Sequence, residues 1–311
     1  MDPLSDVLSL IKLKSYWSVG FEWGGDWCLE AGAHEGIRIY AVVFGECWLS
    51  VEGVPEPIRG STGDCILLPS GRPFRVGSDL SLPPVDELTL FATTGTGGIT
   101  KHNGGGDFLG IGGHFTLAGE YASSFLIKEL PPILHIRKES DKAVLRWTLD
   151  RLRQELHDPQ PGGSLAAQQL ATMLLIQALR VHLAEGVSGG VGWLFALADP
   201  RMRVAISAMH ADPARRWTLQ SLGQRAGMSR TTFAVMFKEM VGKSPMEYLT
   251  HWRMMLAGDR LTSSGDPISV IAPSLGYESE SAFSTAFKRV MGCSPRQYSQ
   301  RDDPTLPIQG S

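Results

Sequence analysis

The sequence predicts an α+β chain of more than one domain: a β-rich N-terminal region, a helical hairpin, and an all-α C-terminal domain with two helix-turn-helix units. Residues 1 to about 130 carry short apolar runs separated by glycine and proline. Beyond Asp141 the hydrophobic period becomes helical, and near the C-terminus one pattern occurs twice. A chain of 311 residues with 43% hydrophobic content is long enough to bury more than one core.

Four runs of aliphatic, β-branched and aromatic residues predict strands in the N-terminal region: "IRIYAVVF", "ECWLSVEG", "CILLPSG" and "LTLFATTG". Their spacing is typical of the strands of a sandwich or barrel. Gly45-Glu46 and Gly63-Asp64 mark tight turns. The stretch 94–113, with "GTGG" and "NGGGD", is expected to be a glycine-rich loop.

Two helical stripes follow, joined by the loop "HDPQPGG". The first stripe consists of Val144, Leu145, Leu149, Leu152 and Leu156, and the second of Leu170, Met173, Leu174, Ile176, Leu179 and Leu183. They predict an antiparallel hairpin. Because the second stripe is wider than one partner helix covers, we favour a homodimer interface, with packing on the β region as the alternative. The stretch 185–192, "EGVSGGVG", is expected to be a linker.

The repeated pattern is "FKEMVGKSPMEY" at 237–248 and "FKRVMGCSPRQY" at 287–298. The same offset pairs Ser229 with Ser279 and Phe233 with Phe283. Two copies are too few for a solenoid, so they indicate two subdomains with similar roles.

Each copy predicts two short helices. In the first, Thr218 caps one helix and Ser229 caps the next, which Gly242 ends. The connection is too short for an antiparallel pair, so the helices must cross steeply, as in a helix-turn-helix. In the second, Asp266 and Ser279 are the expected caps.

Two prolines fall in the first helix of the second copy. Pro267 is expected at its first helical position. Pro273 lies inside the helix and is expected to bend it, because proline removes a backbone hydrogen bond.

The second helix of each copy has two unlike faces. The face expected in the core holds Phe233, Met236, Phe237 and Met240 in the first copy, and Phe283, Ala286, Phe287 and Val290 in the second. The opposite face holds Thr231, Ala234, Val235 and Lys238, and Ser281, Ser284, Thr285 and Lys288. An ordinary solvated face would favour longer polar side chains. Small residues beside a lysine suit a helix that enters a major groove.

The charge distribution agrees with a nucleic-acid partner. Residues 196–301 hold 14 Lys and Arg against 8 Asp and Glu, whereas 1–195 hold 15 against 22. A basic C-terminal region favours a polyanion. These faces and charges together predict binding to double-stranded DNA.

The C-terminal third of the sequence resembles a known family. "SRTTFAVMFKEMVGKSPMEYL", "WRMMLAGDRL" and "GYESESAFSTAFKRVMGCSPRQY" resemble the C-terminal domain of AraC/XylS-type transcription regulators, over residues 196–301. The resemblance implies two recognition helices in successive major grooves, about 34 Å apart, joined by a long helix that includes 248–261. It also implies regulation of transcription, with activation through RNA polymerase favoured over repression.

Carried over by position, the resemblance implies two sets of DNA contacts. The base-facing residues are Thr231, Ala234, Val235, Glu280, Ser281 and Thr285. The phosphate-contacting residues are Ser229, Arg230, Lys238, Arg253, Ser279 and Lys288. None of the base-facing residues is Arg, Asn or Gln, which make bidentate base pairs, so thymine methyl contacts should matter more. Glu280 could accept from cytosine, but we favour a role in complementing its helix N-terminus.

The β-rich region resembles a cupin barrel. "GDCILLPSGRPF" has the form G-x5-P-x-G of the second cupin motif. Phe74 stands where a metal-binding cupin has histidine, and of the other ligand positions only His34 matches, since Gly32 and Arg38 occupy the rest. We therefore expect no metal or other cofactor. The candidate lining residues for an unknown small-molecule effector are Tyr40, Trp48, Arg72 and Phe74.

The predicted organisation is a cupin-like sensor at 1–136, a dimerising hairpin and linker at 137–192, a DNA-binding domain at 193–301 and a disordered tail at 302–311. The expected protein is a dimeric, non-enzymatic regulator, with a metal-dependent cupin enzyme carrying a DNA-binding domain as the alternative. No 18-residue apolar run or signal sequence is seen, which predicts a cytoplasmic protein with no membrane partner.

The four cysteines, Cys28, Cys47, Cys65 and Cys293, form no CxxC pair. Buried, inert thiols are the favoured interpretation. A redox-active Cys47 or Cys65 is the alternative, which requires a cation that lowers the pKa of the thiol.

Overall fold

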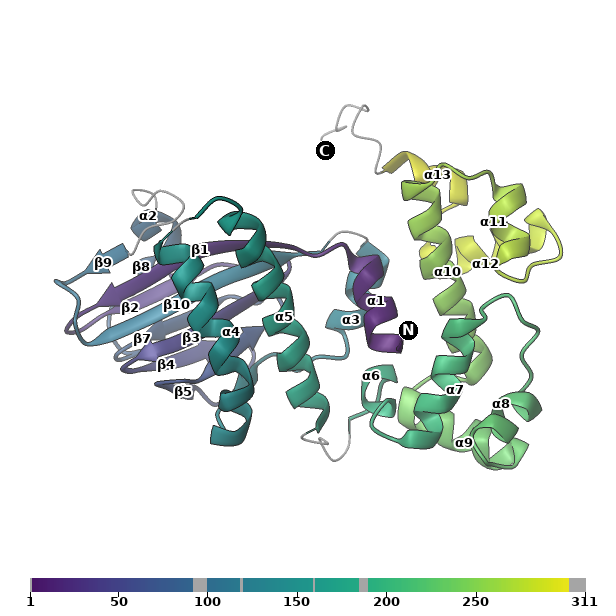
Figure 1. Cartoon of the computed structure of the whole chain (residues 1–311), viewed down its shortest axis with the longest axis horizontal. Helices are drawn as coiled ribbons and strands as arrows, with labels where there is room; N and C mark the ends of the chain where they lie inside the picture. The colour runs from purple at the N-terminus through teal and green to yellow at the C-terminus, as the bar shows by residue number, and fades with distance from the viewer. Residues whose placement is uncertain (1, 92–99, 118–119, 159, 185–189, 302–311) are drawn as a thin grey trace. The chain divides into compact units, whose positions relative to one another are not determined.

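The computed structural model describes residues 2–91, 100–117, 120–158, 160–184 and 190–301. Its contacts divide the chain into two compact units. One, here called the barrel unit, comprises 13–117 and 130–185; the other, the helical unit, comprises 1–12, 118–129 and 186–311. Figure 1 shows the elements of each.

The barrel unit contains two sheets. The first has the order β11-β6-β3-β10-β1-β9 and the second β5-β4-β7-β2-β8. The strands of the first sheet are β1 (Lys14–Trp23), β3 (Ile37–Phe44), β6 (Cys65–Leu68), β9 (Thr100–His102), β10 (Phe108–Thr116) and β11 (Leu134–Ile136). Those of the second are β2 (Cys28–Ala31), β4 (Glu46–Val51), β5 (Ile58–Ser61), β7 (Phe74–Gly77) and β8 (Val85–Asp86). Gly45 and Gly63, at the two predicted turns, have φ of 86°.

One apolar core is shared by both sheets. It includes Val42 and Phe108 from the first sheet and Leu49 and Val76 from the second. Trp23 packs edge-on against Trp27, with ring centroids 4.1 Å apart. On β4 buried residues alternate with more exposed ones, whereas all four residues of β6 are buried. Residues of both sheets thus face one core, as in a barrel.

Part of the expected loop at 94–113 is a central strand. Residues from Phe108 to Gly113 belong to β10, which pairs antiparallel with both β1 and β3. Glycine is depleted in strands, which made this segment look like a loop. The glycines serve packing instead: a Cβ on Gly110 would lie 2.2 Å from the Phe21 ring, and one on Gly112 would lie 3.0 Å from the Tyr40 ring.

The hairpin is present as α4 (Glu139–His157) and α5 (Gly163–Ala184), which lie across one face of the barrel unit in Figure 1. Leu145 and Leu152 of the first predicted stripe are buried, whereas Val144 is 51% exposed. The run "LTLFATTG" was expected to be a strand. Its described part lies in the short helix α2 (Glu87–Phe91).

The helical unit carries the predicted repeat. Its helices are α1 (Pro3–Ile11), α3 (Glu120–Ile127), α6 (Trp193–Ala196), α7 (Pro200–Ala211), α8 (Leu219–Arg225), α9 (Arg230–Val241), α10 (Pro245–Ser263), α11 (Ile268–Ser274), α12 (Glu280–Met291) and α13 (Pro295–Arg301). The pairs α8/α9 and α11/α12 are the two helix-turn-helix units, and α10 is the long helix between them. Across the described residues, no helix has the length and apolar character needed to cross a membrane.

The start of α11 differs from the expectation. Pro267 has an extended backbone and is the N-cap, so the helix begins at Ile268 and Asp266 lies outside it. Pro273 is inside α11 as predicted, but it is the penultimate residue. A proline so near the C-terminal end interrupts little of a seven-residue helix.

The compact units do not follow the expected domain boundaries after residues 136 and 192. Helices α1 and α3 were expected in the sensor, yet they pack in the helical unit. Val7 and Ile11 of α1 and Leu126 of α3 are fully buried. Because α1 ends at Ile11 and β1 begins at Lys14, the chain passes directly from one unit into the other.

Gly110→Ala should lower the free energy of unfolding of the barrel unit by about 1–3 kcal/mol, because the new methyl group would overlap the Phe21 ring. Gly32→Ala is the matched control, since a Cβ there meets nothing within 4 Å. Chemical denaturation monitored by hydrogen exchange of β10 amides measures the effect. Equal stability of the two variants would contradict this account of β10.

Candidate DNA-binding surface and sensor site

The second helix of each helix-turn-helix unit has the orientation predicted from its pattern. The side chains of Phe233, Phe237, Phe283 and Phe287 are completely buried. The opposite faces carry exposed Thr231, Val235 and Lys238 on α9, with Ala234 half-buried, and exposed Glu280, Ser281, Thr285 and Lys288 on α12. Burial of the aromatic stripes therefore turns small polar and apolar side chains outward.

Matching caps fix the ends of these two helices. Ser229 Oγ accepts a hydrogen bond from Thr232 N at 3.2 Å, and Ser279 Oγ accepts one from Ala282 N at 3.2 Å. Gly242 and Gly292 end the helices with φ of 76° and 79°. Both helices have twelve residues, so the two units present equivalent surfaces.

The predicted phosphate-contacting cations divide into two groups. Arg230, Lys238 and Lys288 are exposed. Arg253 is half-buried, and its guanidinium donates to Pro213 O at 2.7 Å and to Arg215 O at 3.0 Å. Arg253 therefore has hydrogen-bond partners inside the helical unit, and its expected phosphate contact stays a prediction. Glu280, in the first turn of α12, lies where a carboxylate complements a helix N-terminus.

Only two of the four candidate effector residues meet in the barrel. The rings of Tyr40 and Phe74 lie 5.7 Å apart. Trp48 alternates with the inward-facing Cys47 and Leu49 on β4 and is 40% exposed. Arg72 is exposed and donates to Glu52 O at 3.2 Å. Strand parity, which the sequence did not settle, turns Trp48 outward on β4, and Arg72 is an exposed loop residue that precedes β7.

The structure adds Arg38, Glu87 and His34 to the site. Arg38 is hydrogen-bonded to Tyr40 Oη at 3.2 Å and forms an ion pair with Glu87 at 2.5 Å, while its guanidinium lies 5.5 Å from the centre of the Phe74 ring. Burial raises the pKa of Tyr40 to about 12, so its hydroxyl stays protonated. Arg38 and Tyr40 are two residues apart on β3, so their side chains lie on the same face of the strand. This spacing is the sequence signal that could have linked the two residues.

His34 is unlike an ordinary surface histidine. Its ring lies 6.1 Å from that of Phe74, and neither ring nitrogen has a hydrogen-bond partner within the part of the chain that is described. Burial lowers the pKa of His34 to about 4, so the ring is neutral at pH 7. This His lies beside the candidate effector site.

The residues present do not fit the metal centre of a cupin enzyme. Gly32 offers no donor, Phe74 presents a ring, and Arg38 is a cation held by Glu87. Over the ranges that the structure describes, no three His, Cys, Asp or Glu side chains gather as a possible metal site.

All four cysteines are buried and free. Burial raises the pKa of Cys47 and of Cys65 to about 12, and it also raises that of Cys28. A thiol that stays protonated is a poor nucleophile. This favours the inert interpretation of these three thiols.

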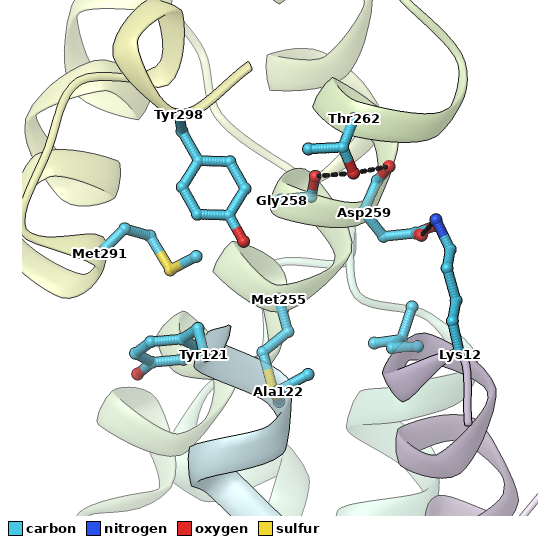
Figure 2. Close-up of a pocket in the computed structure, with 10 residues that line it drawn as sticks. Lys12, Tyr121, Ala122, Met255, Gly258, Asp259, Thr262, Met291 and Tyr298 are labelled. Atoms are coloured by element: carbon cyan, nitrogen blue, oxygen red, sulfur yellow. Dashed lines mark hydrogen bonds and ion pairs between the residues drawn. The ribbon is translucent and has the colours of Figure 1, made fainter. Parts of the chain in front are cut away.

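A small cavity in the helical unit lies between α1, α3, α10, α13 and the C-terminal end of α12 (Figure 2). Its volume is about 50 Å³, and the residues that line it include Tyr121, Met255, Met291 and Tyr298. At its edge Lys12 forms an ion pair with Asp259 at 3.1 Å. Space for one or a few waters is what such a volume provides.

A buried histidine of α7 also joins α1 to α10. His210 Nδ1 lies 3.2 Å from Asp6 Oδ2, and Nε2 lies 2.8 Å from Tyr248 Oη. The imidazole stacks on Trp252 at 3.8 Å. Burial lowers the pKa of His210, while Asp6 opposes that change. The sequence offered no signal for this contact, because its partners lie about 40 and 200 residues from His210.

His34→Gln should reduce the pH dependence of the barrel unit's stability. The pKa of His34 is about 4 in the folded state and near 6.5 when unfolded, so only the unfolded chain gains a proton between these values. The free energy of unfolding of the wild type should therefore fall as the pH drops from about 6.5 to 4, and that of the variant should fall less. Hydrogen exchange of β3 and β7 amides across this window tests it; parallel pH profiles would contradict the assignment.

Two family models match different parts of the chain. Residues 2–184 match the family model described as Cupin, and residues 222–301 match that described as Helix-turn-helix domain. A putative AraC-like transcription regulator of Streptomyces lividans is 41% identical over 99% of this chain and 100% of its own length. The HTH-type transcriptional regulator AlkR of Acinetobacter baylyi is 29% identical over 97% and 100%.

Among solved structures, the C-terminal domain of AraT, a response regulator from Geobacillus stearothermophilus, is 32% identical over 36% of this chain and 93% of its own, with a TM-score of 0.33. The full-length similarity to the Streptomyces lividans regulator, together with the two family models, establishes the assignment. The chain belongs to the AraC-like transcription regulators, with a cupin N-terminal domain and a helix-turn-helix C-terminal domain.

Proposed function

We propose that this regulator places α9 and α12 in two successive major grooves of one DNA duplex. The observation that carries the proposal is the equivalence of the two helices, which share their length, their serine and glycine caps and their exposed small-residue face. B-DNA repeats its grooves about every 34 Å, so a surface presented twice suits it.

Within this arrangement, the small residues read the bases and the cations hold the backbone. Thr231, Ala234 and Val235 face the bases in the first groove, and Ser281 and Thr285 in the second, where Glu280 mainly complements its helix. Methyl groups of Val235 and the threonines suit contact with thymine. Arg230, Lys238 and Lys288 contact phosphates, together with the helix starts at Ser229 and Ser279.

We infer an effector site in the barrel around Tyr40, Phe74 and Arg38. The two rings offer an apolar wall, and the Tyr40 hydroxyl and Arg38 guanidinium offer directed donors. Because Glu87 already neutralises Arg38, an anionic effector would have to displace that carboxylate. A small molecule with an apolar body and one acceptor group fits these contacts best.

Dimerisation through the α4/α5 hairpin is part of the proposal. Trp147 is 68% exposed, and further apolar side chains are exposed on both helices. These are Val144 on α4 and Leu165 and Met173 on α5. Exposed apolar residues grouped on one hairpin are typical of an interface, and a tryptophan is a frequent energetic anchor.

The link from effector to DNA runs through α1 and α3 in this proposal. The helix α1 leads into β1, and β10 leads toward α3. Within the helical unit, these two segments contact the C-terminal helices through Asp6–His210, Lys12–Asp259 and Tyr121–His251. An effector that favours one arrangement of β1 and β10 would bias these contacts. We propose activation of transcription through RNA polymerase, in the cytoplasm where the DNA lies, and no catalytic activity.

Lys238→Ala and Thr285→Ala should weaken DNA binding in different ways. Loss of Lys238 should weaken binding to all sequences and reduce the slope of log K against log salt by about one. Loss of Thr285 should change preference among sites by about 1 kcal/mol and leave that slope unchanged. Titrations of both variants against duplexes selected from a random library, at several salt concentrations, separate the two effects. A uniform loss in both variants would contradict the assignment of faces.

Trp147→Ala should weaken self-association by about 2 kcal/mol, or roughly 30-fold in Kd, if the hairpin forms the dimer interface. Trp48→Ala is the matched control, because it removes an exposed tryptophan from β4 instead. Sedimentation velocity over a range of concentrations measures both. Wild-type association of the Trp147 variant would exclude this interface.

A further inference from the structure

The two helix-turn-helix units touch one another through their loops. The loop 212–217 precedes α8 of the first unit, and the turn 275–279 joins α11 to α12 in the second. Gly276, in this turn, has φ of +81°, and a Cβ on it would lie 2.3 Å from Ala214 O. The backbones of the two loops are therefore in direct contact.

Arg253 of α10 is hydrogen-bonded to the first loop and lies against an aromatic ring of the second. Its Nε and Nη2 donate to the carbonyl oxygens of Pro213 and Arg215, at 2.7 and 3.0 Å. The same guanidinium lies 5.6 Å from the centre of the Tyr277 ring. Tyr277 in turn packs edge-on against Phe283, a buried residue of α12, with ring centroids 5.6 Å apart. Arg253 thus connects the start of the first unit to the core of the second.

The loop on the first-unit side is itself held in place. Trp217 is 5% exposed, and its indole N donates to Asp212 O at 2.9 Å. The guanidinium groups of Arg215 and Arg225 lie 4.3 and 5.3 Å from its ring centre. An exposed ion pair between Arg216 and Glu278 adds a further link between the loops. Contacts other than those of Arg253 therefore also fix the conformation of this loop.

We propose that Arg253 is a positioning residue that sets the distance and rotation between α9 and α12, and so fixes the spacing between the two subsites of the operator. The inference rests on the proposed function, in which both helices contact one duplex. Adding one base pair between the subsites moves the second by about 3.4 Å and turns it by about 35°. A rigid pair of recognition helices cannot follow such a change.

The test uses full-length protein and duplexes selected from a random library by the wild type, with zero, one or two base pairs inserted between the subsites. Arg253→Met keeps a long stem and removes every donor. Wild type should lose about tenfold or more in affinity on a one-base-pair insertion, and the variant about threefold or less. The variant's salt slope should equal that of the wild type, whereas Lys238→Ala, a phosphate-contact control, should lower its slope by about one.

Two further variants guard against misfolding of Arg253→Met. Arg253→Lys retains the charge and one donor group, so it should show an intermediate insertion penalty. Gly276→Ala separates the loops from the other side, since its methyl would meet Ala214 O, and it should also reduce the penalty. Thermal unfolding of each variant confirms that it is folded.

The outcomes separate this inference from the proposed function. If folded Arg253 or Gly276 variants keep the full wild-type penalty, or if Arg253→Met lowers the salt slope by about one, Arg253 is not a spacing device. If the wild type itself tolerates insertions without loss, the two-groove proposal fails first.

Discussion

The fold of the DNA-binding surface depends on the burial of two phenylalanine pairs, Phe233 with Phe237 and Phe283 with Phe287. Each pair removes large apolar rings from water, which stabilises the unit by several kcal/mol in total at about 1.5–3 kcal/mol per ring. A helix has only one such face to bury. Once the rings are inside, Thr231 and Ser281 can only face outward, and the serine and glycine caps then set where each face begins and ends.

The helical half could be predicted closely because its signals are local. Caps, helical stripes and the fifty-residue offset all lie within short windows, and the predicted helix ends at Ser229, Gly242 and Ser279 are confirmed. The exception is α11: Pro267 was expected to be its first helical residue, but Pro267 has an extended backbone and is the N-cap.

The barrel half was predicted less well because its determinants are not local. Gly110 and Gly112 are glycines within a strand because aromatic rings from β1 and β3 occupy the space where their side chains would lie. The exposure of Trp48 follows from strand parity, which a single sequence leaves undetermined. Likewise α1 joins the helical unit through His210, about 200 residues away. The prediction that cupin metal ligands are lacking was made from residue types alone. In the structure, Arg38 forms an ion pair with Glu87, and its guanidinium lies over the Phe74 ring.

The placement of α1 and α3 bears on how this protein can be divided for study. A fragment that starts at residue 193 contains both helix-turn-helix units but lacks Asp6, Val7, Ile11 and Leu126. Such a fragment would leave the His210 ring without its carboxylate partner and would uncover apolar surface that α1 and α3 cover in the intact chain. Grafting this half onto another sensor would therefore require the two short helices to be transplanted with it.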